Sequence, residues 1–248
     1  SKIGKPTVLI PSYNRPQMLK DCLASLYQTN SELFDVLIVD DKSPEINDIL
    51  AVIDQFFPKQ NLSTISTREN VGFTKCVNHG IRYLSQQMRV PSHILLLNND
   101  TILTKSWLDM LPAFHDPKPI GVVAPYRAVW CPDSIYPTAI GQDQPYGKEG
   151  DPRHVRDRMI AETGCTEWYE EHVGFWGCMI RFDLFEKYGL FDERFKIICQ
   201  DLDWSFRIGK YGWKTKVINK DLIHHTGKTH MDLKPRDFID KNVDEDNR

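Results

Sequence analysis

Along the first half of the chain, short aliphatic runs alternate with longer segments whose apolar residues recur every three or four positions. The short runs predict strands at residues 7–11, 34–40, 62–67 and 93–97. The segments between them predict helices at about 15–28, 43–57 and 74–88, as the spacing of Met18, Cys22 and Leu26 illustrates. This alternation is typical of an α/β fold with a mostly parallel central sheet flanked by helices.

The second half of the chain has a less regular pattern. A strand is expected at 121–125, and residues 126–171 then combine prolines, glycines and aromatic residues without periodicity, which predicts a long functional loop. The later regular elements are expected to be a strand at 173–182, a helix at 201–211, and strands at 214–218 and 222–225. The highly charged residues 231–248 are expected to form a frayed tail.

Composition counts against several classes of protein. The chain has 248 residues, of which 41% are hydrophobic, and a net charge of −3, so it can form a full core but lacks the basic excess of a nucleic-acid binder. Its apolar runs are far shorter than the roughly 20 residues that span a bilayer, so no integral membrane segment is expected. The first residues lack the apolar core of a signal peptide, and the six cysteines form no CxxC pair. We therefore expect a cytoplasmic protein with reduced thiols.

Polar residues follow the first four predicted strands of the sheet, at positions 12–15, 40–41, 68–70 and 98–100. Ligands of open α/β sheets bind beyond the carboxyl ends of the strands, so we expect these residues to converge. Asp41 can accept a hydrogen bond from the ring N–H of uracil or thymine while Tyr13 packs on the base; the alternative is a turn that caps the next helix. Asp100 can hold a divalent cation, although Asn-Asn-Asp is also a good turn sequence.

The usual phosphate-binding glycine motifs are missing from the chain. Neither GxxxxGK[ST] nor GxGxxG occurs in the sequence. The charge of a bound diphosphate must then be balanced by a cation and by Arg or Lys. This requirement strengthens the interpretation of Asp100 as a metal ligand.

Eight segments match a known protein family in type and in order. They read VLIPSYNR (8–15), VLIVDDKS (36–43), ENVGF (69–73), LLLNNDT (95–101), GFWGCMIR (174–181), GLFDERF (189–195), QDLDW (200–204) and IHH (223–225). On these segments the chain resembles the family 2 glycosyltransferases with the GT-A fold, and the NNDT sequence is closest to the rhamnosyltransferase-like branch. The resemblance implies one GT-A domain over residues 1–230, with a nucleotide-binding half at about 7–125 and an acceptor and catalytic half at about 126–230.

The resemblance also implies a site for a UDP- or dTDP-sugar donor. Pro11, Tyr13 and Asp41 would hold the nucleoside. Further donor contacts are expected from Arg15, Asn70, Asn99, Trp176 and Lys228. Trp176 lies between glycines and offers a flat face to a sugar ring, although a lone Trp is more often part of the core.

By the same resemblance, Asp100 occupies the last position of the family's DxD metal motif, and Asn98 stands where the first Asp is usual. His224 would complete a site for Mn²⁺ or Mg²⁺, with His225 as a close second. Asp201 matches the general base of the inverting members, which takes the proton of the acceptor hydroxyl. Gln200 replaces the usual Glu, which should leave the pKa of Asp201 less elevated.

Other functions remain open on sequence alone. A sugar-nucleotide pyrophosphorylase shares the sheet topology, but its glycine-rich, lysine-bearing loop is replaced here by residues 12–15. A noncatalytic carbohydrate- or nucleotide-binding module on the same scaffold would fit the departures at Asn98 and Gln200. The acceptor is expected to be a hydroxyl-bearing glycan, with contacts from residues 127–171. Glycolipid, protein and modified nucleic acid carry the same reactive group.

Overall fold

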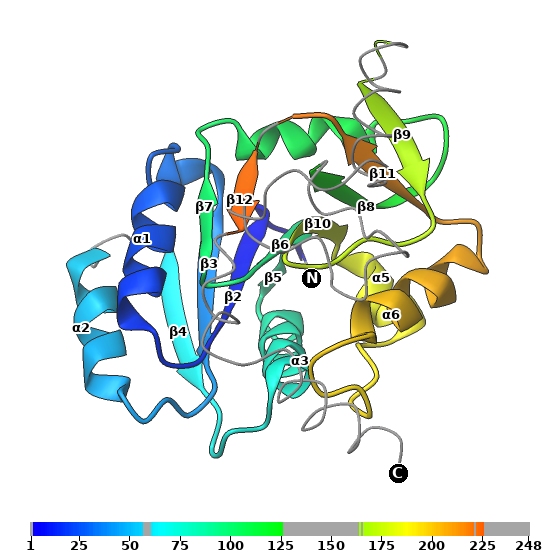
Figure 1. Ribbon diagram of the computed structural model, residues 1–248. Coiled ribbons are helices and arrows are strands. Elements are labelled where there is room, and N and C mark those ends of the chain that lie inside the picture. Colours follow the sequence, from blue (N-terminus) through cyan, green and yellow to red (C-terminus); the bar gives the residue numbers. More distant parts are fainter. Residues whose placement is uncertain (1, 57–60, 126–163, 165, 221, 226–248) are drawn as a thin grey trace, which may run out of the picture.

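The computed structural model describes residues 2–56, 61–125, 164, 166–220 and 222–225. Its centre is an eight-stranded sheet in the order β4-β3-β2-β6-β10-β8-β11-β9, with parallel and antiparallel neighbours (Figure 1). Two small two-stranded sheets, β1-β5 and β12-β7, lie beside it. The expectation of an α/β fold is confirmed, since helices alternate with the strands of the parallel half.

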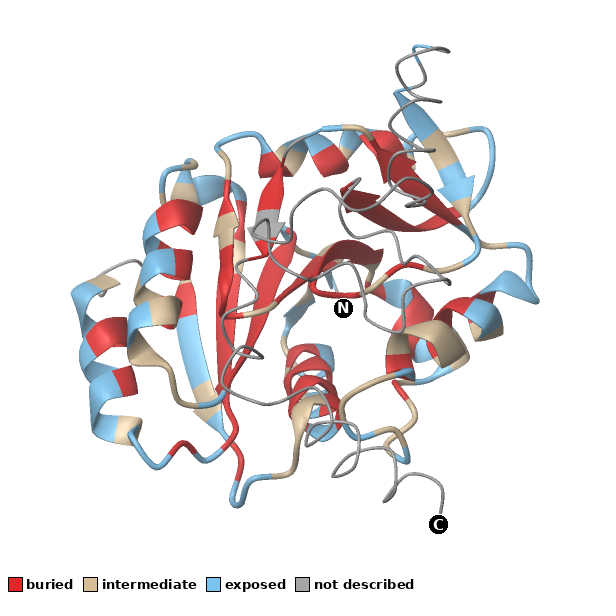
Figure 2. Ribbon diagram, viewed as in Figure 1, coloured by how far each residue is buried: buried red, intermediate tan, exposed pale blue. Residues whose placement is uncertain are grey.

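The parallel half is formed by residues that the hydrophobic pattern marks clearly. Its strands are β2 (Thr7–Ser12), β3 (Asp35–Asp40), β4 (Leu62–Ser66) and β6 (His93–Leu97), and its helices are α1 (Pro16–Leu26), α2 (Ile46–Phe56) and α3 (Phe73–Ser85). The apolar faces of these helices are buried on the sheet, while their outer faces are exposed (Figure 2).

The direction of the chain fixes where the helices lie. From β2 to β4 the chain moves outward across the sheet and then returns to β6 on the other side of β2. Because crossovers between parallel strands are right-handed, the reversal places α1 and α2 on one face and α3 on the opposite face, as Figure 1 shows. α3 packs so closely that a Cβ on Gly80 would lie 2.6 Å from Leu9 Cδ1. The strand order reverses between β2 and β6, which is where open sheets bind ligands.

The second half extends the sheet with antiparallel and parallel strands. Its strands are β8 (Ile120–Pro125), β9 (Glu167–Glu170), β10 (Gly177–Arg181) and β11 (Lys214–Ile218), and its helices are α5 (Asp183–Tyr188) and α6 (Gln200–Gly209). β10 is antiparallel to both β6 and β8. The small sheets consist of β1 (Lys2–Ile3) with β5 (Arg89–Val90) and of β7 (Thr101–Leu103) with β12 (Ile223–His225). Short 3-10 turns occur at Ser31–Leu33, Trp107–Met110 and Pro112–Phe114.

Several elements differ from the prediction. The expected loop at 126–171 ends in a real strand, β9, which pairs with β11 through Trp168 and Val217. α5, β7 and the β1-β5 pair have no counterpart among the predicted elements, because they are two to six residues long and show little periodicity. The expected tail at 231–248 and most of the loop lie outside the described residues. In the described part of the chain, no helix is long and apolar enough to cross a membrane.

Candidate functional site

The carboxyl ends of β2, β3 and β6 bring the predicted polar residues together. Ser12 and Asp40 are register partners at the ends of β2 and β3, and the N–H of Asp41 donates to the carbonyl of Ser12 at 2.8 Å. From the end of β6, the Asn99 side chain donates to the Ser12 hydroxyl at 3.4 Å. Pro11 is buried within β2 directly behind this edge. Convergence of these strand ends is therefore confirmed.

The carboxylate of Asp41 organises the loop that follows β4. One oxygen, Oδ1, accepts from the Thr67 hydroxyl at 3.0 Å and from the Val71 N–H at 2.9 Å, and Oδ2 accepts from the Gly72 N–H at 2.9 Å. The Asn70 side chain donates to the Asp41 carbonyl at 3.3 Å. A carboxylate has about four lone-pair sites, so these three bonds leave one on Oδ2. Asp41 is thus a loop anchor that can accept one further hydrogen bond.

The backbone at the entrance of the site takes left-handed conformations. Four non-glycine residues in the described chain have positive φ: Asn14 (53°), Arg15 (61°), Lys42 (57°) and Cys199 (69°). Three of them follow β2 or β3, and the fourth directly precedes α6. Such conformations cost of order 1 kcal/mol or more each and cluster at functional sites. Tyr13, which precedes two of them, is 46% exposed and available to a ligand.

Asp100 faces a histidine at the pairing of β7 with β12. His225 is the register partner of Thr101, and its Nε2 lies 3.1 Å from Asp100 Oδ1, with both side chains 3% exposed. His225 is therefore the histidine beside Asp100, whereas the prediction names His224 first. The side chain of His224 lies outside the described residues.

A third polar group adjoins this pair. The Nδ2 atom of Asn98 lies 3.3 Å from His225 Nε2, and its Oδ1 is buried with no hydrogen-bond partner among the described residues. A carboxylate oxygen, an imidazole nitrogen and an orphaned amide oxygen are together a donor set that fits Mn²⁺ or Mg²⁺. In the ranges that the structure describes, no group of three or more His, Cys, Asp and Glu is placed to hold a metal ion, at this site or elsewhere, so Asp100 and His225 are a pair of such residues joined only by the Asn98 amide. A cation held by this pair would take its remaining coordination positions from a ligand and water.

Asp201 lies in the first turn of α6 and is half-buried. Its Oδ2 accepts from the Phe175 N–H at 3.3 Å, and its Oδ1 accepts from the Leu202 N–H at 2.9 Å. Burial raises the pKa of this carboxyl above its ordinary value, while hydrogen bonds from the backbone N–H groups of Leu202, Phe175 and Asp201 itself, together with nearby His172, partly oppose the rise. A raised pKa suits a proton acceptor that works near neutral pH.

The dipeptide Phe175-Trp176 connects Asp201 to the Asp100 pair. The Phe175 N–H binds Asp201, and the next residue, Trp176, packs its ring 5.1 Å from that of His225. The Trp176 carbonyl also accepts from the Asn98 N–H at 3.2 Å. Since adjacent Cα atoms are about 3.8 Å apart, the proposed base and a proposed metal ligand contact neighbouring residues of a single short segment.

Some predicted residues differ from the expected placement. Trp176 is only 7% exposed, so it supports His225 and offers little surface to a sugar. Lys228 lies outside the described residues. The Phe175 N–H was missed by the sequence analysis, because no side-chain pattern marks a backbone donor.

The sequence profile described as "Glycosyl transferase family 2" matches residues 7–189. The chain belongs to glycosyl transferase family 2. This match covers the ends of β2, β3, β4 and β6 and the residues around Asp100, whereas Asp201 and His225 lie beyond it. It confirms the family, and with it the transferase class, whereas the rhamnosyltransferase-like branch stays a prediction.

One curated relative of this family 2 chain is the O-antigen biosynthesis protein RfbC of Myxococcus xanthus. It is 26% identical over 233 residues, which are 89% of this chain and 17% of RfbC. The chain thus corresponds to a small part of that protein's length.

Solved structures of glycosyltransferases share the fold of this family 2 chain. The mannosyltransferase PcManGT of Pyrobaculum calidifontis, in complex with GDP-Man and Mn²⁺, has a TM-score of 0.63 at 16% identity, covering 88% of this chain and 55% of its own. TarS of S. aureus in complex with UDP-GlcNAc has a TM-score of 0.60 at 18% identity, and the match covers 89% of this chain and 58% of TarS 1-349. GalNAc-T7 with UDP, GalNAc and Mn²⁺ has a TM-score of 0.64 at 12% identity, and the match covers 86% of this chain and 42% of the GalNAc-T7 chain. At these identities the likeness establishes the GT-A fold.

Proposed function

We propose that this family 2 chain transfers a sugar from UDP or dTDP to a hydroxyl of a glycan acceptor, with inversion and with Mn²⁺ or Mg²⁺ bound. The observation that carries the proposal is the connection of Asp201 to the Asp100–His225 pair through Phe175-Trp176. This connection brings the proposed leaving-group site and the proposed proton acceptor to the same short stretch of chain, as a direct displacement between donor and acceptor requires.

The hydrogen-bonding capacity of Asp41 supports a pyrimidine donor. Its carboxylate has one lone-pair site left after binding the loop. The ring N–H of uracil or thymine supplies one donor, whereas the corresponding edge of guanine supplies a ring N–H and an amino group. Tyr13 is exposed enough to pack on the base. The likeness to a GDP-Man enzyme makes a GDP-sugar the donor to test against.

Asp100, His225 and Asn98 are the residues that would hold the cation. A divalent cation there supplies charge that stabilises the departing diphosphate. Two of the structural relatives are described with Mn²⁺, which supports that choice of metal. The side chains around the pair are packed tightly, since Trp176 covers His225, so the ligands are held in place before the donor binds.

Asp201 is assigned as the general base. It takes the proton of the acceptor hydroxyl while the acceptor oxygen forms a bond to the anomeric carbon and the bond to the diphosphate oxygen breaks. The nucleoside diphosphate leaves with the electron pair of the broken bond. One direct displacement inverts the anomeric carbon.

The acceptor is proposed to be a glycan or glycolipid, because the curated relative is described as an O-antigen biosynthesis protein. The Asn98-Asn-Asp-Thr101 sequence supports a hexosyl or deoxyhexosyl donor of the rhamnosyltransferase-like branch. Asn98 and Gln200 also keep a second candidate, a noncatalytic nucleotide-sugar-binding module.

A panel of UDP-, dTDP- and GDP-sugars separates these functions. Nucleotide release with and without Mn²⁺ is measured for each donor, and binding is measured in parallel. We expect metal-dependent release from a UDP- or dTDP-sugar. Preferred release from a GDP-sugar would contradict the assignment of Asp41, and donor binding without any release would favour the noncatalytic module.

A further inference from the structure

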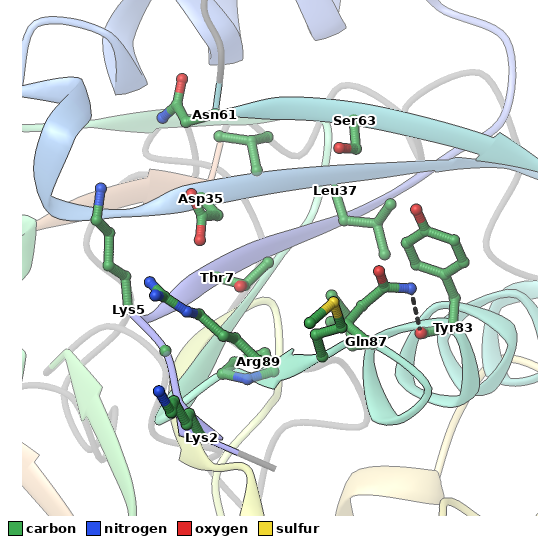
Figure 3. A pocket seen from close by; sticks show the side chains of 15 residues that line it. Lys2, Lys5, Thr7, Asp35, Leu37, Asn61, Ser63, Tyr83, Gln87 and Arg89 are labelled. Carbon is green, nitrogen blue, oxygen red and sulfur yellow. Dashed lines mark hydrogen bonds between the residues drawn. The ribbon is translucent and has the colours of Figure 1, made fainter.

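A cavity of about 1010 Å³ opens at the amino-terminal edge of the sheet, away from the proposed donor site. It is lined by the first residues of β2 and β3, by the end of α3 and by the β1-β5 pair (Figure 3). β2 has six residues. At about 3.3 Å per residue, the five steps from Thr7 in the lining to Ser12 place the cavity roughly 17 Å from the proposed donor site.

Three cationic side chains line one side of this cavity. Lys2 and Arg89 are register partners in the β1-β5 pair, and the Gly4 N–H donates to the Val90 carbonyl at 2.7 Å, which brings Lys5 next to them. Figure 3 shows the charged ends of Lys2, Lys5 and Arg89 on one side of the cavity, with Tyr83 on the other. All three cations are exposed, and none of them forms a salt bridge within the described ranges.

One carboxylate opposes these three charges. Asp35 is the acidic residue of the lining, and its burial raises its pKa although Lys5 opposes the rise. The cavity therefore carries a net positive charge in a chain whose total charge is −3. A local excess of cations inside a concave site attracts anions even when the whole protein is weakly acidic.

The geometry points to a second ligand site at this edge: we propose that Lys2, Lys5 and Arg89 bind the phosphate group of an anionic ligand. Ammonium and guanidinium groups form charge-assisted hydrogen bonds to phosphate oxygens, and Arg does so with two parallel bonds. The opposite wall includes Leu37, and Met88 at the rim is 93% exposed, so an organic part of the ligand finds apolar contacts. Soluble phosphate compounds and phospholipid headgroups share this chemistry.

The test uses the whole chain in EDTA, which removes divalent cations from the donor site. One arm measures equilibrium binding of inorganic pyrophosphate, and the other measures sedimentation with phosphatidylcholine vesicles that contain or lack phosphatidylglycerol. Lys5→Gln and Arg89→Gln are compared with Lys105→Gln, which changes an exposed lysine outside the lining of this cavity. Circular dichroism checks that each variant is folded, as expected for exposed positions.

We expect binding in at least one arm, weakened roughly tenfold or more by each cavity variant, since hydrogen bonds to charged groups contribute at this level. Lys105→Gln is expected to bind as the wild type does, and so is Asp100→Ala, which alters the donor site alone. Binding in the pyrophosphate arm identifies a soluble ligand, and binding only to phosphatidylglycerol vesicles identifies a lipid. Absence of binding in both arms, or equal binding by the cavity variants and wild type, overturns the proposal.

Discussion

Replacing Asp201 by Asn removes the proposed base and changes little else. The two side chains have the same shape, and an amide oxygen can still accept from the Phe175 N–H or the Leu202 N–H. One of these two bonds is lost, which costs about 1 kcal/mol of the free energy of unfolding. Removal of a desolvated charge offsets part of that cost, because burial raises the pKa of the native carboxyl. Folding and donor binding should therefore survive.

Catalysis should not survive this change. A positioned general base contributes typically 10²- to 10⁴-fold, so we expect kcat for transfer to fall by at least about two orders of magnitude. The donor dissociation constant should stay nearly unchanged, because the proposed role of Asp201 is toward the acceptor hydroxyl and not toward the donor. The assay is nucleotide release with a competent acceptor, combined with donor binding by calorimetry.

The pH dependence of the wild-type enzyme gives an independent check. A base must be deprotonated to act, and its pKa is raised above the ordinary value of 3.8. Activity should thus be lost as pH falls through a pKa that lies above 3.8, and this acidic limb should disappear from the residual activity of Asp201→Asn. Transfer by the variant at a near-normal rate would refute the assignment of the base.

Further predictions concern the donor site and stability. Asp100→Ala should abolish the Mn²⁺ dependence of donor binding, and an unchanged Mn²⁺ titration would contradict the ligand assignment. His225→Gln should weaken Mn²⁺ binding at least about tenfold, since the imidazole is proposed as a direct ligand. His224→Gln serves as the neighbouring control, and a larger loss in His224→Gln would favour His224 as the ligand. Asp41→Asn should lower the free energy of unfolding by about 1 to 3 kcal/mol, because the part-buried N–H groups of Val71 and Gly72 would share one acceptor oxygen fewer. An unchanged urea midpoint would refute this. Burial lowers the pKa of His93 to about 4, so the unfolded state binds more protons than the folded state between pH 6.5 and 4. The free energy of unfolding should therefore fall by about 2 kcal/mol as pH drops through this range. Urea unfolding of His93→Leu should lack this contribution.

Long periodic elements could be predicted from the sequence. The strands at β2, β3, β6 and β11 match their expected positions to within a residue or two. In β2, β3 and β6 the reason is a continuous β-branched and aliphatic run, for which burial in a sheet is strongly favoured. Convergence of Ser12, Asp40 and Asn99 followed from the parallel sheet alone.

Features that depend on long-range pairing could not be predicted. His224 and His225 are equivalent in sequence, and only the register of β12 against β7 decides that His225 lies beside Asp100. Trp176 looked like an exposed platform because glycines flank it, yet it is buried by packing on His225. The role of Asp41 as a loop anchor depends on backbone donors thirty residues away, which leave no pattern in the sequence.

The most direct test of the account is a crystal structure of the chain with Mn²⁺ and a nonhydrolysable UDP-sugar, with the metal located by its anomalous scattering. The account predicts one Mn²⁺ peak bound by Asp100 and His225, a uracil ring N–H on Asp41, and the anomeric carbon facing Asp201. A metal peak elsewhere, or a sugar turned away from Asp201 in a fully bound donor, would contradict it.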